Sequence, residues 1–269
     1  MSYTLYRLNG KFIKSSDGKL YGYEKAAYEK NLADNSWSQI QRGLNEGNPM
    51  GWAIGDTKSL TLTNGDTYTI RLVDLQEGRY ESTTGVKCKA TFEFVECLKG
   101  IARAMNSSTK TYDGVTNYTA GGWLNSDMRT YIKSSVVSLI PEELSNVMLL
   151  NKVGSASYGG SGRSDTSAGG KIIYSDGDKL FLASQSELDS STGEYTSESN
   201  VYPEFDYYKT HDTNSDRIKY QLGSTSAVYY WNRSPSYSRS SYFCNVSSIG
   251  DWYYFYANYT YSVCPCFTL

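Results

Sequence analysis

The chain has 269 residues and a formal net charge of -2, with 26 Lys and Arg against 28 Asp and Glu. No stripe of basic residues is present, so the composition argues against binding to nucleic acid or to an anionic membrane surface. No apolar run approaches the roughly 18 residues of a membrane span, and the N-terminal residues lack the apolar core of a secretory signal. We therefore expect no membrane insertion and a protein made in the cytoplasm.

The cysteines and the single histidine give no sign of a metal or redox centre. An odd number of cysteines in a chain of this kind predicts reduced thiols. They are Cys88, Cys97, Cys244, Cys264 and Cys266. The C-P-C spacing of the last two is not that of a zinc or redox motif, and His211 lies in a polar segment without a nucleophile motif nearby. We predict no cofactor and no metal.

The N-terminal third predicts an extension followed by a helix and a hairpin. Residues 1–33 hold little apolar periodicity and resemble an attachment segment, in which "LNGKFIKSSDGKLYGYE" predicts a short strand, a turn and another strand. Ser36 and Gln39 stand at capping-box spacing, so a helix should begin there and end before Gly47 and Pro49. The alternating segment "SLTLTNGDTYTIRLVDL" predicts a hairpin around Asn64-Gly65.

The middle of the chain predicts short elements separated by long loops. "TFEFVECL" fits a strand or a helix. "GGWLNSDMRTYI" predicts a second helix capped by Asn125 or Ser126, and Pro141 opens a short helical turn. We expect strands at "NVMLLNKV" and "KLFLASQSEL", with polar surface loops over 154–170 and 189–216. These elements predict a loop-rich α+β domain over residues 34–269.

The residue composition changes abruptly after Gln221. Residues 1–221 contain 39 Lys, Glu, Gln or Met residues, which predicts roughly eight among the last 48, yet residues 222–269 contain none. Tyr, Ser and Asn replace them. A buried core would favour aliphatic residues over so many hydroxyls and amides. An exposed recognition surface explains the mixture, because Tyr offers rigid contact area and Ser and Asn adapt their hydrogen bonds.

The genetic code sharpens this interpretation. If only the adenines of an AAC or AAT asparagine codon are randomised, then Tyr, Ser, Thr, Asp, Ile, Phe, Cys, Arg, Gly and Ala become reachable. Lys, Glu, Gln, Met and Trp do not. Four of these five are absent after Gln221, and the two Trp present would be fixed scaffold positions. The pattern therefore favours asparagine codons mutated at adenines over selection of an antibody-like composition.

Several motifs resemble a known family. "YYWNRSP", "FCNVSSIGDW" and the ending "ANYTYSVCPCFTL" are similar to the C-terminal region of variable proteins from diversity-generating retroelements. Upstream, "GWAIGD", "NGDTYTIRLVDL", "GGWLNSDMRTYI" and "DKLFLASQSEL" resemble a lectin-like domain with a W-L-R-S-P signature that is common in gut bacteria and their phages. The resemblance implies a C-type-lectin-like fold with small antiparallel sheets and two or so short helices.

The resemblance also implies a variable region over about residues 229–262. Its ligand-contacting positions would be Tyr229, Tyr230, Asn232, Ser236, Tyr237, Ser238, Arg239, Ser240, Ser241, Tyr242, Asn245, Ser247, Ser248, Asp251, Tyr253, Tyr254, Tyr256, Asn258, Tyr259 and Tyr261. The fixed frame would be Trp231, Arg233, Pro235, Phe243, Val246, Trp252, Ala257, Val263, Pro265 and Phe267. Asn232 stands where the signature has Leu, and Ser262 stands where the family has Gly.

The function implied is non-catalytic display of a hypervariable surface. The partner would be a protein or surface molecule of a host or bacterium, and the protein would be associated with a phage particle or stay in the cytoplasm. Two alternatives remain open. One is a lectin-like interaction domain that is not diversified. The other is an enzyme similar to formylglycine-generating oxidases, in which Cys244 would pair with Cys264 or Cys266. A calcium site is not expected, since the carboxylate and amide ligands of lectins are missing.

Overall fold

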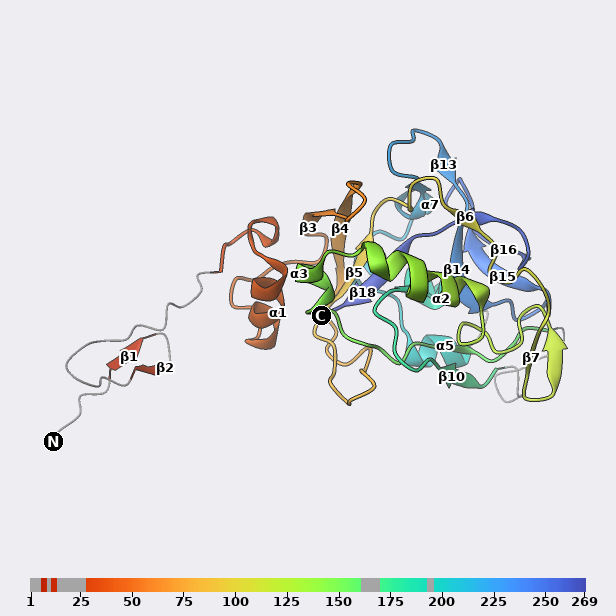
Figure 1. Ribbon diagram of the computed structural model, residues 1–269, viewed down its shortest axis with the longest axis horizontal. Helices are drawn as coiled ribbons and strands as arrows, with labels where there is room; N and C mark the ends of the chain where they lie inside the picture. The colour runs from red at the N-terminus through yellow and green to blue at the C-terminus, as the bar shows by residue number, and fades with distance from the viewer. Residues whose placement is uncertain (1–5, 9–10, 14–27, 161–169, 193–195) are drawn as a thin grey trace.

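The computed structural model describes residues 6–8, 11–13, 28–160, 170–192 and 196–269. The fold class is α+β, with several small and mostly antiparallel sheets surrounded by short helices and loops (Figure 1). Two five-stranded sheets form its framework. Helix α1 (Trp37–Asn45) lies at one end of the folded part, and strands β15 (Tyr242–Val246) and β16 (Trp252–Tyr256) lie at the other.

The first sheet has the strand order β11-β18-β5-β4-β3 and is antiparallel throughout. Its strands are β3 (Thr57–Thr61), β4 (Thr67–Asp74), β5 (Thr91–Phe94), β11 (Phe181–Leu182) and β18 (Pro265–Thr268). The C-terminal strand β18 therefore lies between elements that are far earlier in the sequence. Every residue of β5 and β18 is buried, which makes these two strands the centre of the core.

Helix α1 covers the first sheet with its apolar side. The ring of Trp37 lies 5.8 Å from Phe92 and 5.6 Å from Phe267, and both contacts are edge-on. The helix begins where the sequence predicts, since Ser36 accepts from the backbone of Gln39 and the side chain of Gln39 accepts from the backbone of Ser36. The predicted capping box is confirmed.

The second sheet has the strand order β16-β15-β14-β17-β6. Its remaining strands are β6 (Ala102–Arg103), β14 (Tyr230–Pro235) and β17 (Tyr261–Ser262). Strand β14 runs parallel to β17 and antiparallel to β15, with an irregularity between Trp231 and Pro235. Four of these five strands come from the region where the composition changes, so the second sheet is built almost entirely from that region.

The remaining short elements belong to neither five-stranded sheet. The two-stranded pairs are β1 (Tyr6–Leu8) with β2 (Lys11–Ile13), β7 (Lys110–Tyr112) with β8 (Val115–Asn117), β9 (Gly154–Ala156) with β10 (Ile172–Tyr174), and β12 (Lys219–Tyr220) with β13 (Ala227–Val228). The other α-helices are α2 (Asp127–Tyr131), α3 (Glu142–Ser145), α4 (Gln185–Leu188), α5 (Thr196–Val201), α6 (Asp206–Thr210) and α7 (Asn214–Arg217). Short helices are thus more numerous than the two or so expected.

Several predicted elements are confirmed. Strands β3 and β4 form the hairpin around Asn64-Gly65, and Gly65 has the positive φ of 89° that such a turn needs. The ambiguous segment "TFEFVECL" contains strand β5. Ser126, not Asn125, caps α2 by accepting from the backbone of Arg129 at 3.0 Å.

Two predicted strands are wrong or shorter than expected. Residues 146–153 contain no strand, and within this stretch only Asn151 forms isolated bridges, to Ser82 and Asp178. In "KLFLASQSEL" the strand is limited to Phe181–Leu182, because Ser184 and Glu187 form a capping box that begins α4. The predicted strand is therefore shorter than expected because the capping box begins a helix at Gln185.

Both predicted surface loops contain regular structure and buried residues. Residues 154–160 are buried and begin with strand β9, whereas residues 161–169 lie outside the described part. The segment 189–216 contains α5, α6 and most of α7, and it buries Glu198, Tyr202 and Phe205. The sequence did not predict these helices because their few apolar and aromatic residues are separated by many polar ones. The residues against which they pack are distant in the sequence.

The N-terminal extension is described only in part. The predicted strands are present as β1 and β2, which pair through residues 6–8 and 11–13. Residues 14–27 lie outside the described part. Just before the expected boundary at residue 34, Leu32 is buried in the core and Tyr28 contacts the ring of Trp52.

Candidate ligand-binding face

Most of the predicted fixed frame is buried in or beside the second sheet. Trp231 is 1% exposed, and five further frame residues have no measurable exposure. These are Arg233, Phe243, Val246, Ala257 and Val263. Pro265 and Phe267 are buried in β18 of the first sheet. The predicted frame therefore joins strands β14 to β17 to the rest of the core.

Arg233 connects strand β14 to three other elements through buried hydrogen bonds and an ion pair. Its Nε donates to the Gly154 carbonyl and its Nη1 to the Leu182 carbonyl, both at 2.8 Å, and Nη1 also lies 2.6 Å from a carboxylate oxygen of Glu187. Burial alone would lower the pKa of the guanidinium, but Glu187 more than offsets this effect, and the pKa is raised. Arg233 thus carries a fully buried charge that ties β14 to β9, β11 and α4.

The neighbouring Ser234 and the more distant Trp252 add two further anchors. Ser234 donates to Glu198 and accepts from the backbone of Gln185. The indole Nε1 of Trp252 donates to Asp189 at 2.6 Å, and the guanidinium of Arg217 lies 5.2 Å from the Trp252 ring centre. The scaffold role expected for Trp252 is consistent with these contacts.

Nine of the twenty predicted ligand-contacting residues are exposed, and six more are half-buried. The exposed ones are Tyr229, Tyr237, Arg239, Asp251, Tyr253, Tyr254, Tyr256, Asn258 and Tyr259. The half-buried ones are Ser238, Ser240, Ser241, Tyr242, Ser248 and Tyr261. Tyr253, with 52% of its surface exposed, and Tyr259, with 51%, are the most accessible of these tyrosines.

Five of the exposed tyrosines and two half-buried ones gather into one aromatic surface, which we call the tyrosine face. It consists of Tyr229, Tyr242, Tyr253, Tyr254, Tyr256, Tyr259 and Tyr261, with Phe255 between them. Ring centres are 4.3 Å apart for Tyr242 and Tyr256, and 5.1 Å apart for Tyr229 and Tyr261. Strand β16, the edge strand of the second sheet, carries three of the tyrosines, so the surface rests on a hydrogen-bonded backbone.

Five predicted contact residues are buried, and the structure corrects their assignment to a ligand surface. They are Tyr230, Asn232, Ser236, Asn245 and Ser247. The Tyr230 hydroxyl donates to the Arg217 carbonyl at 2.9 Å, and the Ser247 hydroxyl accepts from the backbone of Asp251 in the β15–β16 turn. The codon argument identifies residue types that are reachable by mutation, but it contains no information about burial.

Two exposed residues were missed by the sequence reasoning. Ile249 is 68% exposed at the tip of the β15–β16 turn, and Thr260 is exposed beside Tyr259. Both types are reachable from an asparagine codon by changes at adenines, so the signal that selected their neighbours was present for them as well.

Cys244 and Cys266, which the enzyme alternative pairs, lie on strands of different sheets. Cys244 lies on β15 of the second sheet, and Cys266 lies on β18 of the first sheet opposite Phe181. Cys264 donates to the Phe94 carbonyl at 2.9 Å. All five cysteines are buried and free of disulfides. Burial raises the pKa of the Cys266 thiol well above its ordinary value.

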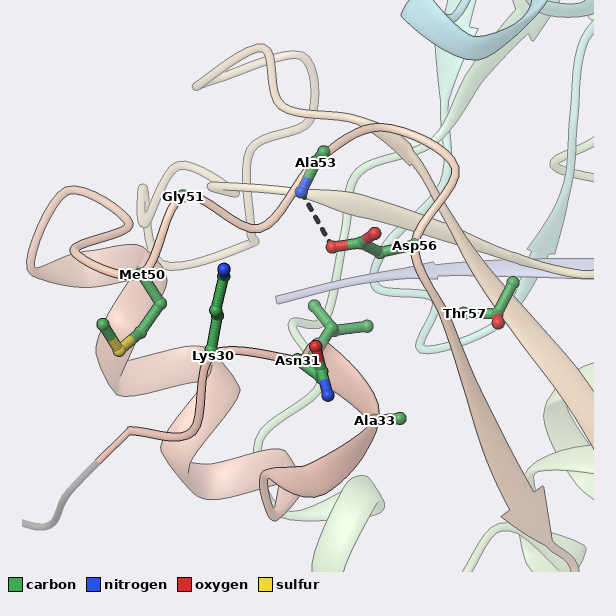
Figure 2. A pocket seen from close by; sticks show the side chains of 9 residues that line it. Lys30, Asn31, Ala33, Met50, Gly51, Ala53, Asp56 and Thr57 are labelled. Atoms are coloured by element: carbon green, nitrogen blue, oxygen red, sulfur yellow. Dashed lines mark hydrogen bonds between the residues drawn. The ribbon is translucent and has the colours of Figure 1, made fainter.

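The described surface includes a hollow at each end of the folded part. One, of about 380 Å³, lies near α1 at the end away from the tyrosine face and is bordered by Lys30, Met50 and Asp56 (Figure 2). The Asp56 carboxylate there accepts from the backbone of Ala53, so it is engaged in a turn. The other hollow, of about 660 Å³, lies between β6 and α2 and reaches Thr260, beside the tyrosine face.

Within the described part, no group of three or more His, Cys, Asp or Glu residues is arranged to hold a metal ion. The helices described there include none with the length and apolar character needed to cross a membrane.

Comparison with known proteins gives one match. Residues 99–269 match the family described as a domain of unknown function, DUF6273. The matched region is more than half of the chain and includes all five strands of the second sheet. No curated protein and no solved structure matches the chain.

Proposed function

Because the chain belongs to the DUF6273 family, whose description states no activity, we propose from the site itself that this is a hypervariable ligand-binding protein. Adenine-directed mutagenesis diversifies its C-terminal region, and the tyrosine face contacts a protein or surface molecule of a host or bacterial cell. The single observation that carries the proposal is a separation by burial: all but one of the predicted frame residues are buried, whereas fifteen of the twenty predicted contact residues are exposed or half-buried.

The finer fold assignment belongs to the same proposal. We place the domain among C-type-lectin-like folds, and its loop-rich build with two small sheets supports this assignment. The buried contacts of Arg233 and Ser234 give the R-S-P part of the signature a structural reason. A receptor-binding or display role, on a phage particle or in the cytoplasm, follows from the family resemblance.

The chemistry of the tyrosine face favours binding over catalysis. Tyrosine supplies a large contact area at the entropic cost of two torsions, and its hydroxyl hydrogen-bonds at the rim. The only charges between Leu222 and Leu269 are Arg233, Arg239 and Asp251, and Arg233 is buried. Binding through the tyrosine face alone should therefore depend weakly on salt.

Sequencing of the gene and its surroundings tests the proposal. We expect a nearly identical template repeat beside a reverse-transcriptase gene, differing from the coding copy only at adenines of the template. Among isolates, substitutions should concentrate at exposed codons such as those of Tyr253, Tyr254 and Tyr259, and they should spare Trp231 and Arg233. A locus without a repeat, or with changes scattered over all bases, would instead indicate a lectin-like interaction domain that is not diversified.

A further inference from the structure

The hollow between β6 and α2 is an open groove lined by both polar and apolar residues, and it adjoins the tyrosine face at Thr260. Its volume of about 660 Å³ lies in the range of small-molecule sites, roughly 300 to 1,000 Å³. Arg103 and Tyr131 line it, and Thr260 closes the end nearest Tyr259 and Tyr261. Except for Thr260, the lining residues precede the variable region, so the groove belongs to the fixed part of the protein.

Arg103 is held in position but has a free guanidinium. Its carbonyl accepts from the indole Nε1 of Trp231 at 2.8 Å, which fixes the backbone, and its guanidinium carbon lies 4.0 Å from the ring centre of Tyr131. The residue is exposed, and in the described part of the chain its side chain forms no ion pair or hydrogen bond. Arg71, Arg79 and Arg129, by contrast, each pair with a carboxylate.

The one acidic residue that lines the groove does not compete for Arg103. An oxygen of the Asp127 carboxylate accepts from both the backbone and the hydroxyl of Ser107 at 2.9 Å, and Lys110 pairs with the other oxygen. Burial alone would raise the pKa of Asp127, but Lys110 and Ser107 lower it. Asp127 is therefore charged and already neutralised, so Arg103 remains the uncompensated charge of the groove.

The rest of the lining offers hydroxyl groups. After α2 the chain continues as a π-helical segment, Ile132–Val136, which presents Ser134 and Ser135 to the groove. Such segments occur frequently at functional sites. Thr130 and Thr260 add further hydroxyls. A planar arginine suits a carboxylate, and a row of hydroxyls suits a ligand that itself carries several hydroxyl groups.

We propose that this groove binds a carboxylated sugar of the uronic acid type, with Arg103 receiving the carboxylate and the serine and threonine hydroxyls contacting the ring substituents. The inference rests on the proposed function, because it makes the groove a constant subsite beside the variable tyrosine face. Every member of the repertoire would then share a preference for acidic glycans, and the tyrosine face would select among them.

Titration of the full chain with methyl glucuronoside and methyl glucoside, followed by NMR, tests the inference. We expect saturable millimolar binding of the glucuronoside and binding of the glucoside that is about tenfold or more weaker. Arg103→Gln should remove this difference, and Arg103→Lys should retain only part of it because lysine cannot form a bidentate pair. Lys99→Gln, which removes one exposed charge from outside the groove, should bind like the unmodified protein.

Three results would overturn the inference. These are equal binding of the two sugars, unchanged glucuronoside binding by Arg103→Gln, and binding of a glutamate-rich peptide without binding of the sugar. The last result would assign Arg103 to a protein ligand. None of them bears on the template repeat at the gene, so failure of this inference is distinguishable from failure of the proposed function.

Discussion

Arg233 is a buried charged side chain within the region that the sequence predicts to vary. Its partner Glu187 is fully buried, as is Arg233 itself. We expect Arg233→Met to lower the free energy of unfolding by about 3–5 kcal/mol, because the carboxylate of Glu187 would lose its counter-charge inside the protein. Urea unfolding measures the change.

The matched control is Arg239→Met, which removes the same charge from an exposed position in the next loop. Its effect should stay within about 0.5 kcal/mol. Similar losses for the two variants would show that Arg233 is not a specific anchor.

Asn232 is buried, but its side-chain amide forms no hydrogen bond in the described structure. Both the nitrogen and the oxygen of its side chain are buried and have no partner in the described structure. We expect Asn232→Leu, which introduces the Leu of the W-L-R-S-P signature, to raise the free energy of unfolding by about 1–3 kcal/mol, since an unpaired amide would no longer be desolvated. Thermal or urea unfolding is the measurement.

Asn258→Leu serves as the comparison, because Asn258 is exposed and its amide is solvated in both states. It should leave stability nearly unchanged. A loss of stability in Asn232→Leu would show that the amide has a bound partner, such as an internal water molecule.

At the scale of elements, strand β16 combines replaceable and required side chains. Tyr253 and Tyr254 are exposed, whereas Trp252 is half-buried and donates to Asp189. We expect Tyr253→Ser and Tyr254→Ser each to change the free energy of unfolding by no more than about 0.5 kcal/mol. Trp252→Ser should cost about 2–3 kcal/mol, because it loses ring packing and the contact with Arg217.

Thermal unfolding of the three single variants compares them directly. A large loss for either tyrosine variant would mean that the tyrosine face is part of the core, and it would remove the basis for a surface that is free to vary.

The elements that could be predicted from the sequence are those determined by nearby residues. The capping box at Ser36 and the Asn64-Gly65 turn act over three or four residues, and both are where the sequence predicts them. A second capping box at Ser184 and Glu187 was equally local, but the apolar residues before it favoured a strand. Helices α5 and α6 depend on distant partners, since Glu198 and Tyr208 are buried against β14 and β5 respectively.

The difference between local signals and distant packing partners also explains which parts of the candidate site could be predicted. Composition and codon chemistry identified the tyrosine face, yet they could not separate Tyr253 from Tyr230, because both are tyrosines in strands of the same sheet. Only tertiary packing determines which of the two reaches solvent. The groove at Arg103 was missed for a related reason, since its lining residues come from β6, α2 and the turn after β16.

At the scale of the whole molecule, the two sheets are linked through a buried charge cluster around Glu93 on β5. Its carboxylate accepts from Arg71 Nε of β4 at 2.9 Å, from the Tyr208 hydroxyl of α6 at 3.1 Å and from Lys219 Nζ of β12 at 3.1 Å. The Lys219 ammonium in turn lies 5.8 Å from the ring centre of Tyr230, on β14 of the second sheet. Removal of this one carboxylate should therefore affect the whole fold.

Burial alone would raise the pKa of Glu93, but Lys219 and Arg71 lower it below its ordinary value of 4.5. A carboxyl group whose pKa is lower in the folded than in the unfolded state stabilises the fold above the unfolded pKa. This contribution is lost as the pH falls through the folded pKa. We therefore expect the free energy of unfolding to decrease below pH about 4.5, as measured by urea unfolding between pH 3 and 7.

Glu93→Gln should make this acid dependence shallower and should cost about 3–5 kcal/mol at pH 7, because the buried Lys219 and the half-buried Arg71 would be left with too little negative charge. Asp176→Asn is the control, since Asp176 also has a lowered pKa, through Arg129 and Lys133, but is largely exposed. It should cost less than about 1 kcal/mol at pH 7. An unchanged acid dependence in Glu93→Gln would place the titrating carboxylate elsewhere, and the link between the two sheets would then not depend on Glu93.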